Sequence, residues 1–172
     1  MVVESTTGSG PHEGLLAWLA ANHVEYELRE HPETFTAEAT ARAEHVDPRR
    51  FAKVVGVAAS DGRQVLLVVD AADHVDFAKA RRVLAAADAR LLTEAELTTM
   101  TRGCEPGTVP PIPALFGLPT YVDFALRDTA VLAFHAGSHR FAVHVDRIAW
   151  ERASGIAWAD IAEDDDAPAW AK

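Results

Sequence analysis

Hydrophobic and polar positions follow one another with a period that changes along the chain. Between positions 15 and 19 hydrophobic residues recur at helical spacing, and between positions 24 and 28 they alternate with charged residues. The first pattern is typical of an amphipathic helix and the second of a half-buried strand. The folded part of the chain is therefore predicted to open with a helix followed by a strand.

The next signals predict a second helix and then a hairpin. Thr36 can cap a helix that ends before Pro48, because its hydroxyl can accept from the N–H groups left open in the first turn. Two runs rich in β-branched residues, 54–59 and 64–69, are joined by Ser60-Asp61-Gly62-Arg63. Asp-Gly between two such runs predicts a β-hairpin.

The remaining pattern alternates short helices with strands. A basic amphipathic segment predicts a helix over 77–87, and a short strand follows near Leu91. Thr93 and Glu96 have the spacing of a capping box, which predicts a helix to about Met100. Further strands are predicted over 121–124, 131–134 and 141–145, with a last short helix near Asp146. This mixture predicts one compact α/β domain of the α+β type.

The segment from Arg102 to Pro119 interrupts this pattern. It contains five prolines and three glycines, so neither a regular helix nor a central strand is expected there. Strand patterns continue beyond it, and the segment is therefore predicted to be an ordered loop inside one domain.

Length and composition favour one domain with unstructured ends. With 172 residues, 49% of them hydrophobic, the chain can bury one sizeable core. Residues 1–11 are rich in Ser, Thr and Gly and are predicted to be disordered, 12–151 to form the domain, and 152–172 to form an acidic tail. Three apolar residues of that tail could still dock on the body, namely Ile156, Trp158 and Ile161.

Net charge, targeting signals and cysteine content limit the partners and the cellular compartment that we expect. A formal charge of -10 argues against a protein that coats DNA or RNA nonspecifically, since phosphate binding depends on Lys and Arg. No basic leader or apolar stretch of roughly 20 residues is evident, and the single cysteine, Cys104, excludes an intramolecular disulfide. We therefore expect a cytoplasmic protein that has no membrane partner and does not bind DNA.

Lys53 is the first residue that could carry chemistry. It stands at the start of an apolar strand run, where it could be directed into a pocket and hold a phosphate or carboxylate as a point charge. It could equally be a strand-end lysine that reaches solvent. Spacing alone leaves both interpretations open.

The loop from Gly103 to Pro111 is the second candidate. Glycines let backbone N–H groups approach a ligand closely and prolines fix the shape of the loop, so the segment could present donors to a carbonyl or a developing oxyanion. A rigid structural connection would use the same residues.

A thiol nucleophile and a metal site are weaker alternatives. Cys104 could be activated by His135, His139 or His144, but a lone cysteine beside glycine is also typical of a small buried residue. His135 and His139 flank Ala136-Gly137-Ser138, which is predicted to be a turn rather than a helix face. The helical spacing of metal ligands is therefore absent, and no metal is predicted.

Several segments in order resemble the YbaK family, also called the prolyl-tRNA synthetase associated or editing domain. The resemblance covers roughly residues 13 to 150. It is carried by a threonine-led helix start, a segment with a characteristic lysine, a loop with a Gly-x-x-x-Pro element, a strand entry and a glycine turn. These are Thr36-Ala37-Glu38-Ala39, Phe51-Ala52-Lys53-Val54-Val55, Gly103 to Pro111 with the element at Gly107 and Pro111, Leu115 to Asp123, and Ala136-Gly137-Ser138-His139.

The resemblance implies a fold and an activity. The fold would have a mixed, mostly antiparallel sheet, partly barrel-like, with surrounding helices. The activity would be trans-acting hydrolysis of the ester between a wrong amino acid and the 3'-terminal ribose of tRNA. The expected substrate is tRNA for proline that carries a small residue such as Cys or Ala, and prolyl-tRNA synthetase is the implied protein partner.

The resemblance also implies roles for residues. Lys53 would anchor the charged end of the substrate, and the backbone at Gly107 would polarise the ester carbonyl. The substrate's own ribose hydroxyl would help to activate water, so no cofactor or metal is implied. Further substrate contacts are expected from Thr36, Thr108, Val109, Pro110, Pro111, Gly137 and Ser138.

One departure leaves the specificity open. The family commonly has Phe-Gly after the Pro-Pro pair, whereas this chain has Ile112-Pro113, which changes the aromatic content and the backbone freedom of the loop. Two other functions also remain open: a non-catalytic module of the same fold that recognises aminoacyl-tRNA or a synthetase, and a thiol hydrolase that uses Cys104.

Overall fold

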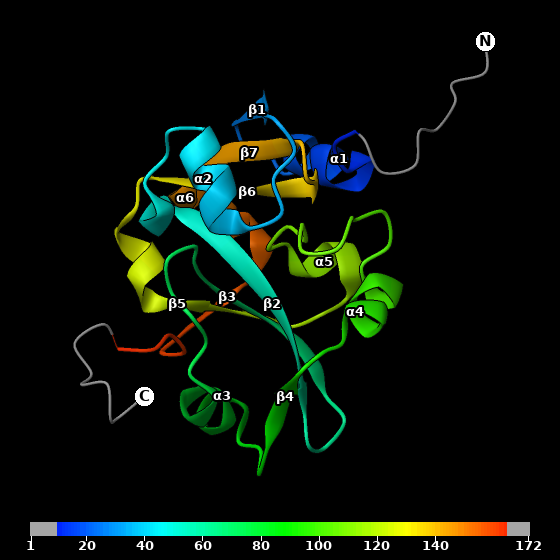
Figure 1. The fold of residues 1–172 in the computed structure, drawn as a ribbon, viewed down its shortest axis with the longest axis vertical. Helices are drawn as coiled ribbons and strands as arrows, with labels where there is room; N and C mark the ends of the chain where they lie inside the picture. Colours follow the sequence, from blue (N-terminus) through cyan, green and yellow to red (C-terminus); the bar gives the residue numbers. More distant parts are fainter. Residues whose placement is uncertain (1–9, 165–172) are drawn as a thin grey trace.

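The computed structural model describes residues 10–164, and its strands form one eight-stranded sheet in the order β1-β7-β6-β2-β3-β5-β8, with β4 beside β2 (Figure 1). The strands are β1 (Tyr26–Glu30), β2 (Phe51–Ala59), β3 (Gln64–Asp70), β4 (Ala89–Leu91), β5 (Thr120–Asp123), β6 (Val131–Ser138), β7 (Phe141–Asp146) and β8 (Ala157–Ala159). Every strand predicted from alternation is present.

The sheet is mixed, with more antiparallel than parallel pairs. β1 with β7, β6 with β7, and β2 with both β3 and β4 are antiparallel. β2 with β6, β3 with β5, and β5 with β8 are parallel. Among the described residues the end strands β1 and β8 do not pair with each other, so the predicted mixed sheet is confirmed but does not close into a barrel.

Short helices surround the sheet. They are α1 (Glu13–Ala21), α2 (Ala37–Ala43), η1 (Pro48–Arg50), α3 (Phe77–Leu84), α4 (Glu94–Met100), α5 (Pro113–Phe116), η2 (Phe124–Asp128) and α6 (Arg147–Ser154). All but α5 begin at a residue whose side chain caps the first turn. The Thr36 hydroxyl accepts from the Ala39 N–H at 3.0 Å. Thr93 and Glu96 form the predicted capping box at the start of α4. Both helix starts are therefore confirmed. No described helix is long and apolar enough to cross a membrane.

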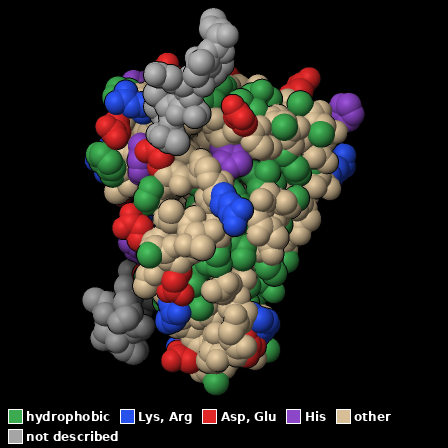
Figure 2. All heavy atoms as spheres, turned by 90° about the vertical axis from the view of Figure 1, so that its right-hand side faces the viewer, with side chains coloured by type: hydrophobic (Ala, Val, Ile, Leu, Met, Phe, Trp, Pro, Cys, Tyr) green, Lys and Arg blue, Asp and Glu red, His purple; other side chains and the backbone are tan. Residues whose placement is uncertain are grey.

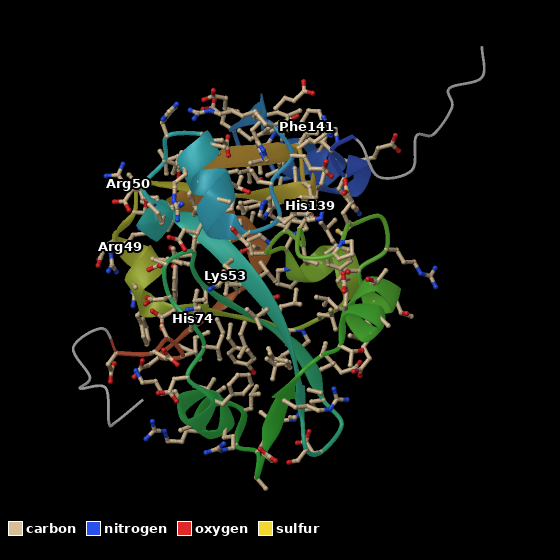
Figure 3. All side chains as sticks on the ribbon, viewed as in Figure 1. Arg49, Arg50, Lys53, His74, His139 and Phe141 are labelled. Carbon is tan, nitrogen blue, oxygen red and sulfur yellow. The ribbon has the colours of Figure 1, made fainter. Side chains whose placement is uncertain are left out.

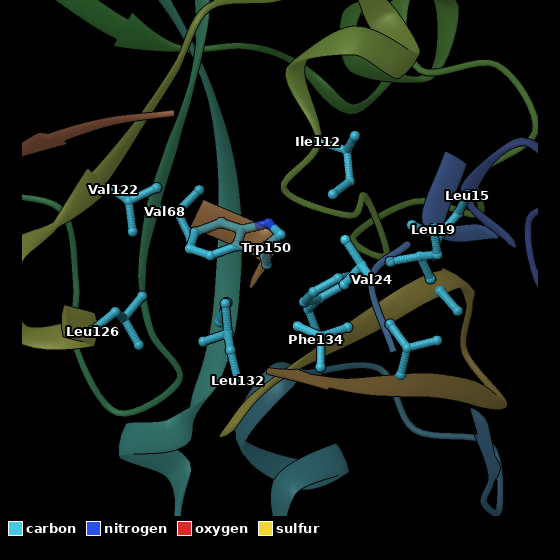
Figure 4. Packing of buried hydrophobic residues seen from close by; sticks show 14 residues of the cluster. Leu15, Leu19, Val24, Val68, Ile112, Val122, Leu126, Leu132, Phe134 and Trp150 are labelled. Atoms are coloured by element: carbon cyan, nitrogen blue, oxygen red, sulfur yellow. The ribbon is translucent and has the colours of Figure 1, made fainter. Parts of the chain in front are cut away.

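The main core lies where α1, α6 and the sheet meet. Phe134, Leu132 and Trp150 are fully buried in it and pack with residues from α1 and β3 (Figure 4). The Trp150 indole nitrogen donates to the Pro111 carbonyl at 3.1 Å. Since a buried indole N–H needs a partner, this bond ties the proline-rich loop to the core.

Two local predictions need correction. The 102–119 segment is an ordered loop as predicted, but it contains one helical turn, α5, because Pro113 occupies the first turn, where its missing N–H is not needed, and Gly117 ends it. The turn predicted at Ala136-Gly137-Ser138 lies further along the chain. β6 continues to Ser138 with an irregular register after His135, and the chain turns between Ser138 and Phe141.

The segment after α6 packs on the body, as Ile156, Trp158 and Ile161 suggested. β8 pairs with β5, and Ile161 is fully buried. The ammonium of Lys79 on α3 donates to Asp160 at 2.9 Å, to Asp164 at 2.7 Å and to the Ala162 carbonyl at 2.8 Å. Residues 1–9 of the predicted disordered start and residues 165–172 of the predicted acidic tail lie outside the described residues.

Candidate functional site

β2 places Lys53 in the middle of the molecule. The strand lies between β6 and β3, with Lys53 opposite Val69. Its ammonium donates to the Asp73 carbonyl. Because a lysine has three N–H donors, this bond leaves others for a ligand. Burial lowers the pKa of Lys53, and the neighbouring carboxylates of Asp70 and Asp73 oppose that shift.

Hydrogen bonds from α2 to β6 fix one wall of the site. The Thr40 hydroxyl lies 2.8 Å from His135 Nε2 and 2.6 Å from the Thr34 hydroxyl. His135 is buried, and its ring packs edge-on against Phe51 with centroids 5.1 Å apart. Desolvation, with His31 and His139 nearby, lowers the pKa of His135 to about 3. His135 is therefore a neutral hydrogen-bonding group at neutral pH.

The glycine-proline loop is fastened to β6 and presents Gly107. The Glu105 N–H donates to the Gly137 carbonyl at 3.0 Å, and the Gly137 N–H donates to the Thr108 carbonyl at 3.0 Å. Gly107 itself is exposed with φ of 78°, a conformation that glycine adopts at no steric cost. No bond from the Gly107 N–H to another residue in 10–164 is seen. This N–H is therefore available to a ligand.

A glycine is needed at position 137 because His12 approaches the backbone there closely. It has φ of 79°, and a Cβ at this position would lie 2.8 Å from the Cβ of His12. The His12 N–H donates to the Ala136 carbonyl at 2.7 Å, and its ring lies 2.9 Å from the Arg102 carbonyl. His12 therefore joins the start of α1 to both the loop and β6.

A cleft of about 330 Å³ brings three of the predicted site residues together. Thr36, Lys53 and Gly107 all line it, and Figure 3 shows Lys53 central on this face, between His139 and His74. The other lining residues are Phe35, Ala37, Val54, Val55, Gly56, Leu91, Leu92, Leu97 and His135. The site thus combines a cation, an exposed backbone N–H and an extended apolar wall.

The other six predicted residues do not line the cleft. They are buried behind it in the loop and in β6, and they are Thr108, Val109, Pro110, Pro111, Gly137 and Ser138. Bonds from the Gly137 N–H to the Thr108 carbonyl and from Trp150 to the Pro111 carbonyl hold the loop in place. Direct contact of the six residues with a substrate remains a prediction.

Sequence reasoning missed two parts of the cleft. The sequence suggests His135 as a base for Cys104 or, with His139, as a metal ligand, and not as a residue of the cleft, because the strand is predicted to end before it. The wall formed by Leu91, Leu92 and Leu97 carries no motif, since apolar residues around a short strand are typical of any core. The pairing of β4 with β2, which brings this wall to the cleft, is a tertiary contact.

The surroundings of Cys104 do not favour a thiol nucleophile. The side chain is buried in an apolar cluster with Leu66, Val109 and Leu118, and burial raises the pKa of the thiol to about 12. The nucleophilic form of cysteine is the thiolate. In the part of the chain that the structure describes, no three His, Cys, Asp or Glu side chains are grouped so that they could hold a metal ion.

A family model described as the aminoacyl-tRNA editing domain matches residues 31–152, a segment that contains Thr36, Lys53 and Gly107. The chain belongs to this family. The resemblance to the YbaK family is thereby confirmed. No curated protein sequence matches the chain.

Solved structures share the fold of this editing domain. A hypothetical protein superposes with a TM-score of 0.80 at 21% identity, over 88% of this chain and all of its own (100%). A candidate trans-editing enzyme for prolyl-tRNA synthetase superposes with a TM-score of 0.75 at 24% identity, over 87% of this chain and 95% of its own. At these identities the likeness establishes the fold alone.

Proposed function

We propose that this editing domain is a trans-acting aminoacyl-tRNA deacylase that hydrolyses the ester of mischarged tRNA. The observation that carries the proposal is the convergence of Lys53, Thr36 and Gly107 on one cleft inside the segment matched by the family. The Lys53 ammonium anchors the charged end of the substrate, because a half-buried cation attracts anions more strongly than an exposed one.

The Gly107 N–H polarises the ester carbonyl. A backbone donor on a fixed loop stabilises the negative charge that develops on the carbonyl oxygen when water attacks. A bond forms between the water oxygen and the carbonyl carbon, and the bond to the ribose oxygen breaks. The departing ribose oxygen takes up one proton of the attacking water, the second is released to solvent, and the amino acid leaves as a free carboxylate. A ribose hydroxyl of the substrate helps to activate the water.

The proposed substrate is tRNA for proline that carries a small wrong amino acid, such as Cys or Ala. The resemblance to prolyl-tRNA editing domains supports the tRNA, and the name of one structural neighbour agrees with it. Prolyl-tRNA synthetase is the proposed protein partner, which would release or present the mischarged tRNA.

Deacylation screening tests the proposal. Alanyl-, cysteinyl- and seryl-tRNA for proline are incubated with the protein, and release of free amino acid is followed with correctly charged prolyl-tRNA as the control. We expect at least one mischarged substrate to be hydrolysed. Saturable binding of mischarged tRNA without turnover of any of them would instead identify a non-catalytic binding module.

Lys53→Ala tests the proposed anchor. It is expected to lower kcat/KM by roughly 100-fold, the order seen when one charge-stabilising donor is removed. Lys53→Arg keeps the charge and serves as the conservative control, and thermal melting of both variants reports folding. Full activity of a folded Lys53→Ala would exclude the proposed role.

A further inference from the structure

The two ends of the cleft differ in chemistry. Thr36, Lys53, Gly107 and His135 supply polar groups at one end, whereas the other end is formed by an apolar shelf. The shelf consists of Leu91, Leu92 and Leu97, of which Leu92 and Leu97 lie over Gly56 and Leu91 is paired with Val57. Lys53 and Gly56 both line this cleft from β2, so the shelf and the proposed reaction site belong to one cleft.

Gly56 determines how closely the leucine side chains of the shelf approach the backbone of β2. The Leu92 N–H donates to the Gly56 carbonyl at 2.9 Å. A Cβ at Gly56 would lie 2.8 Å from Leu97 Cδ1 and 2.9 Å from Leu92 Cδ1, closer than carbon atoms pack. The two leucine side chains therefore lie directly against the backbone of β2.

The edge of the shelf is open to solvent. Leu91 is 56% exposed although its strand, β4, is paired with β2. Leu91 is therefore accessible at the edge of the cleft, and an apolar wall with a few polar groups is typical of a ligand-binding cleft.

We propose that this apolar shelf binds the face of the 3'-terminal adenine of the substrate tRNA. The inference rests on the proposed deacylase function, in which Lys53 anchors the charged end of the substrate and the Gly107 N–H polarises the ester carbonyl. The ester is attached to the ribose of the terminal nucleotide, so the adenine must lie within one nucleoside of these two residues. The base is the part of that nucleotide with large apolar faces. The shelf is an apolar wall of the same cleft, and we place it within one nucleoside of Lys53 and Gly107.

The proposal predicts how the shelf selects a ligand. It contacts the face of a base and offers no side-chain hydrogen-bonding group to its edge, because Leu91, Leu92 and Leu97 carry none. Recognition of a face tolerates different bases. The shelf therefore positions the terminal nucleotide, while specificity for the amino acid belongs to the polar end of the cleft.

Leu91→Asp, with Leu28→Asp as its matched control, tests the shelf. Leu28 is also an exposed leucine on a strand (38% exposed), but it lies on β1, three strands away from β2. Leu91→Asp is expected to raise KM for mischarged tRNA about tenfold with kcat changed less than about twofold, because a lost base contact weakens binding without touching the ester. Leu28→Asp is expected to behave as the wild type.

Gly56→Ala provides a second variant that adds no charge. The methyl group would push the ends of Leu92 and Leu97 into the cleft, so the variant is expected to raise KM in the same way. Thermal melting shows whether each variant is folded. Titration of 5'-AMP, followed by NMR chemical shifts, measures nucleotide binding without any reaction.

The outcomes separate this inference from the proposed function. If the wild type hydrolyses mischarged tRNA and Leu91→Asp has the same KM as Leu28→Asp, the proposed adenine-binding role of the shelf is wrong and the proposed deacylase function is supported. If the wild type hydrolyses nothing, the deacylase fails and the 5'-AMP titration decides. Saturable shifts that are lost in Leu91→Asp and kept in Leu28→Asp support the shelf, and any other result of the titration overturns it.

Discussion

Cys104 illustrates how burial can remove a reactive residue from consideration. Its thiol pKa of about 12 leaves almost no thiolate at pH 8. We predict that the native protein reacts with a thiol reagent such as DTNB at least roughly 100-fold more slowly than the protein unfolded in guanidinium. Cys104→Ser provides the blank and is expected to keep full deacylation activity. Rapid modification of the native thiol would contradict this prediction.

His135 should make stability depend on pH. Its folded pKa of about 3 lies below its ordinary value of 6.5, so between these values the unfolded chain binds a proton that the folded chain does not. Stability from this residue is therefore complete above pH 6.5 and is lost as the pH falls toward 3. Urea unfolding from pH 4 to 7 should show a slope about one proton steeper in the wild type than in His135→Gln. Parallel curves would show that this residue has no such role.

Residues with a local signal could be predicted. Thr36 and Thr93 have cap positions and spacing that bond within one turn. Lys53 and Gly107 were joined into one site only by the family resemblance. His135 could not be placed, because its position depends on a bond to Thr40, 95 residues earlier in the chain.

The helices and strands differ in how well the pattern of hydrophobic and polar residues predicted them. β2 and β3 are long, buried and joined by a tight turn, so their pattern is strong. α5 is a single turn that depends on where Pro113 falls, and the irregular register of β6 near Gly137 depends on the approach of His12. Periodicity contains no information about such contacts between distant segments.

Gly137→Ala tests the packing of α1 on β6. The variant combines a left-handed backbone with a contact of 2.8 Å to His12, and it should lower the free energy of unfolding by roughly 1–3 kcal/mol. Gly62→Ala is the matched control. Its φ is 92°, but no atom lies within 4 Å of the added Cβ. In urea unfolding, equal losses in the two variants would show that the contact with His12 contributes nothing.

The whole molecule carries a charge of -10, which opposes an RNA polyanion. On the face shown in Figure 2, hydrophobic patches lie among scattered acidic and basic side chains, without a continuous basic surface. Arg49 and Arg50 lie on the same face as Lys53 toward one side of it (Figure 3). Attraction to phosphates is therefore local rather than global.

The weak attraction between this acidic protein and tRNA phosphates predicts that prolyl-tRNA synthetase delivers the mischarged tRNA to it. We expect prolyl-tRNA synthetase to lower KM for mischarged tRNA, and a pull-down to recover the synthetase only when tRNA is present. Without the synthetase, KM should rise further as salt is increased, because the few phosphate contacts are screened. Tight tRNA binding that is unaffected by the synthetase would contradict delivery.

The pairings of β2 with β6 and of β5 with β8 could not be predicted from the sequence, since each joins segments far apart in the chain. Loop-closure entropy must be overcome before such contacts form.

The anchoring of Lys79 bears on where the chain can be cut. Desolvation alone would lower the pKa of this buried ammonium, but its bonds to Asp164 and Asp160 raise the pKa instead. A fragment that ended at the family boundary, residue 152, would lack both carboxylates and the Ala162 carbonyl, and would leave a buried cation without these partners. It would also uncover the edge of β5, a free template for another chain. Such a fragment would therefore be prone to aggregation even though it keeps every residue of the cleft.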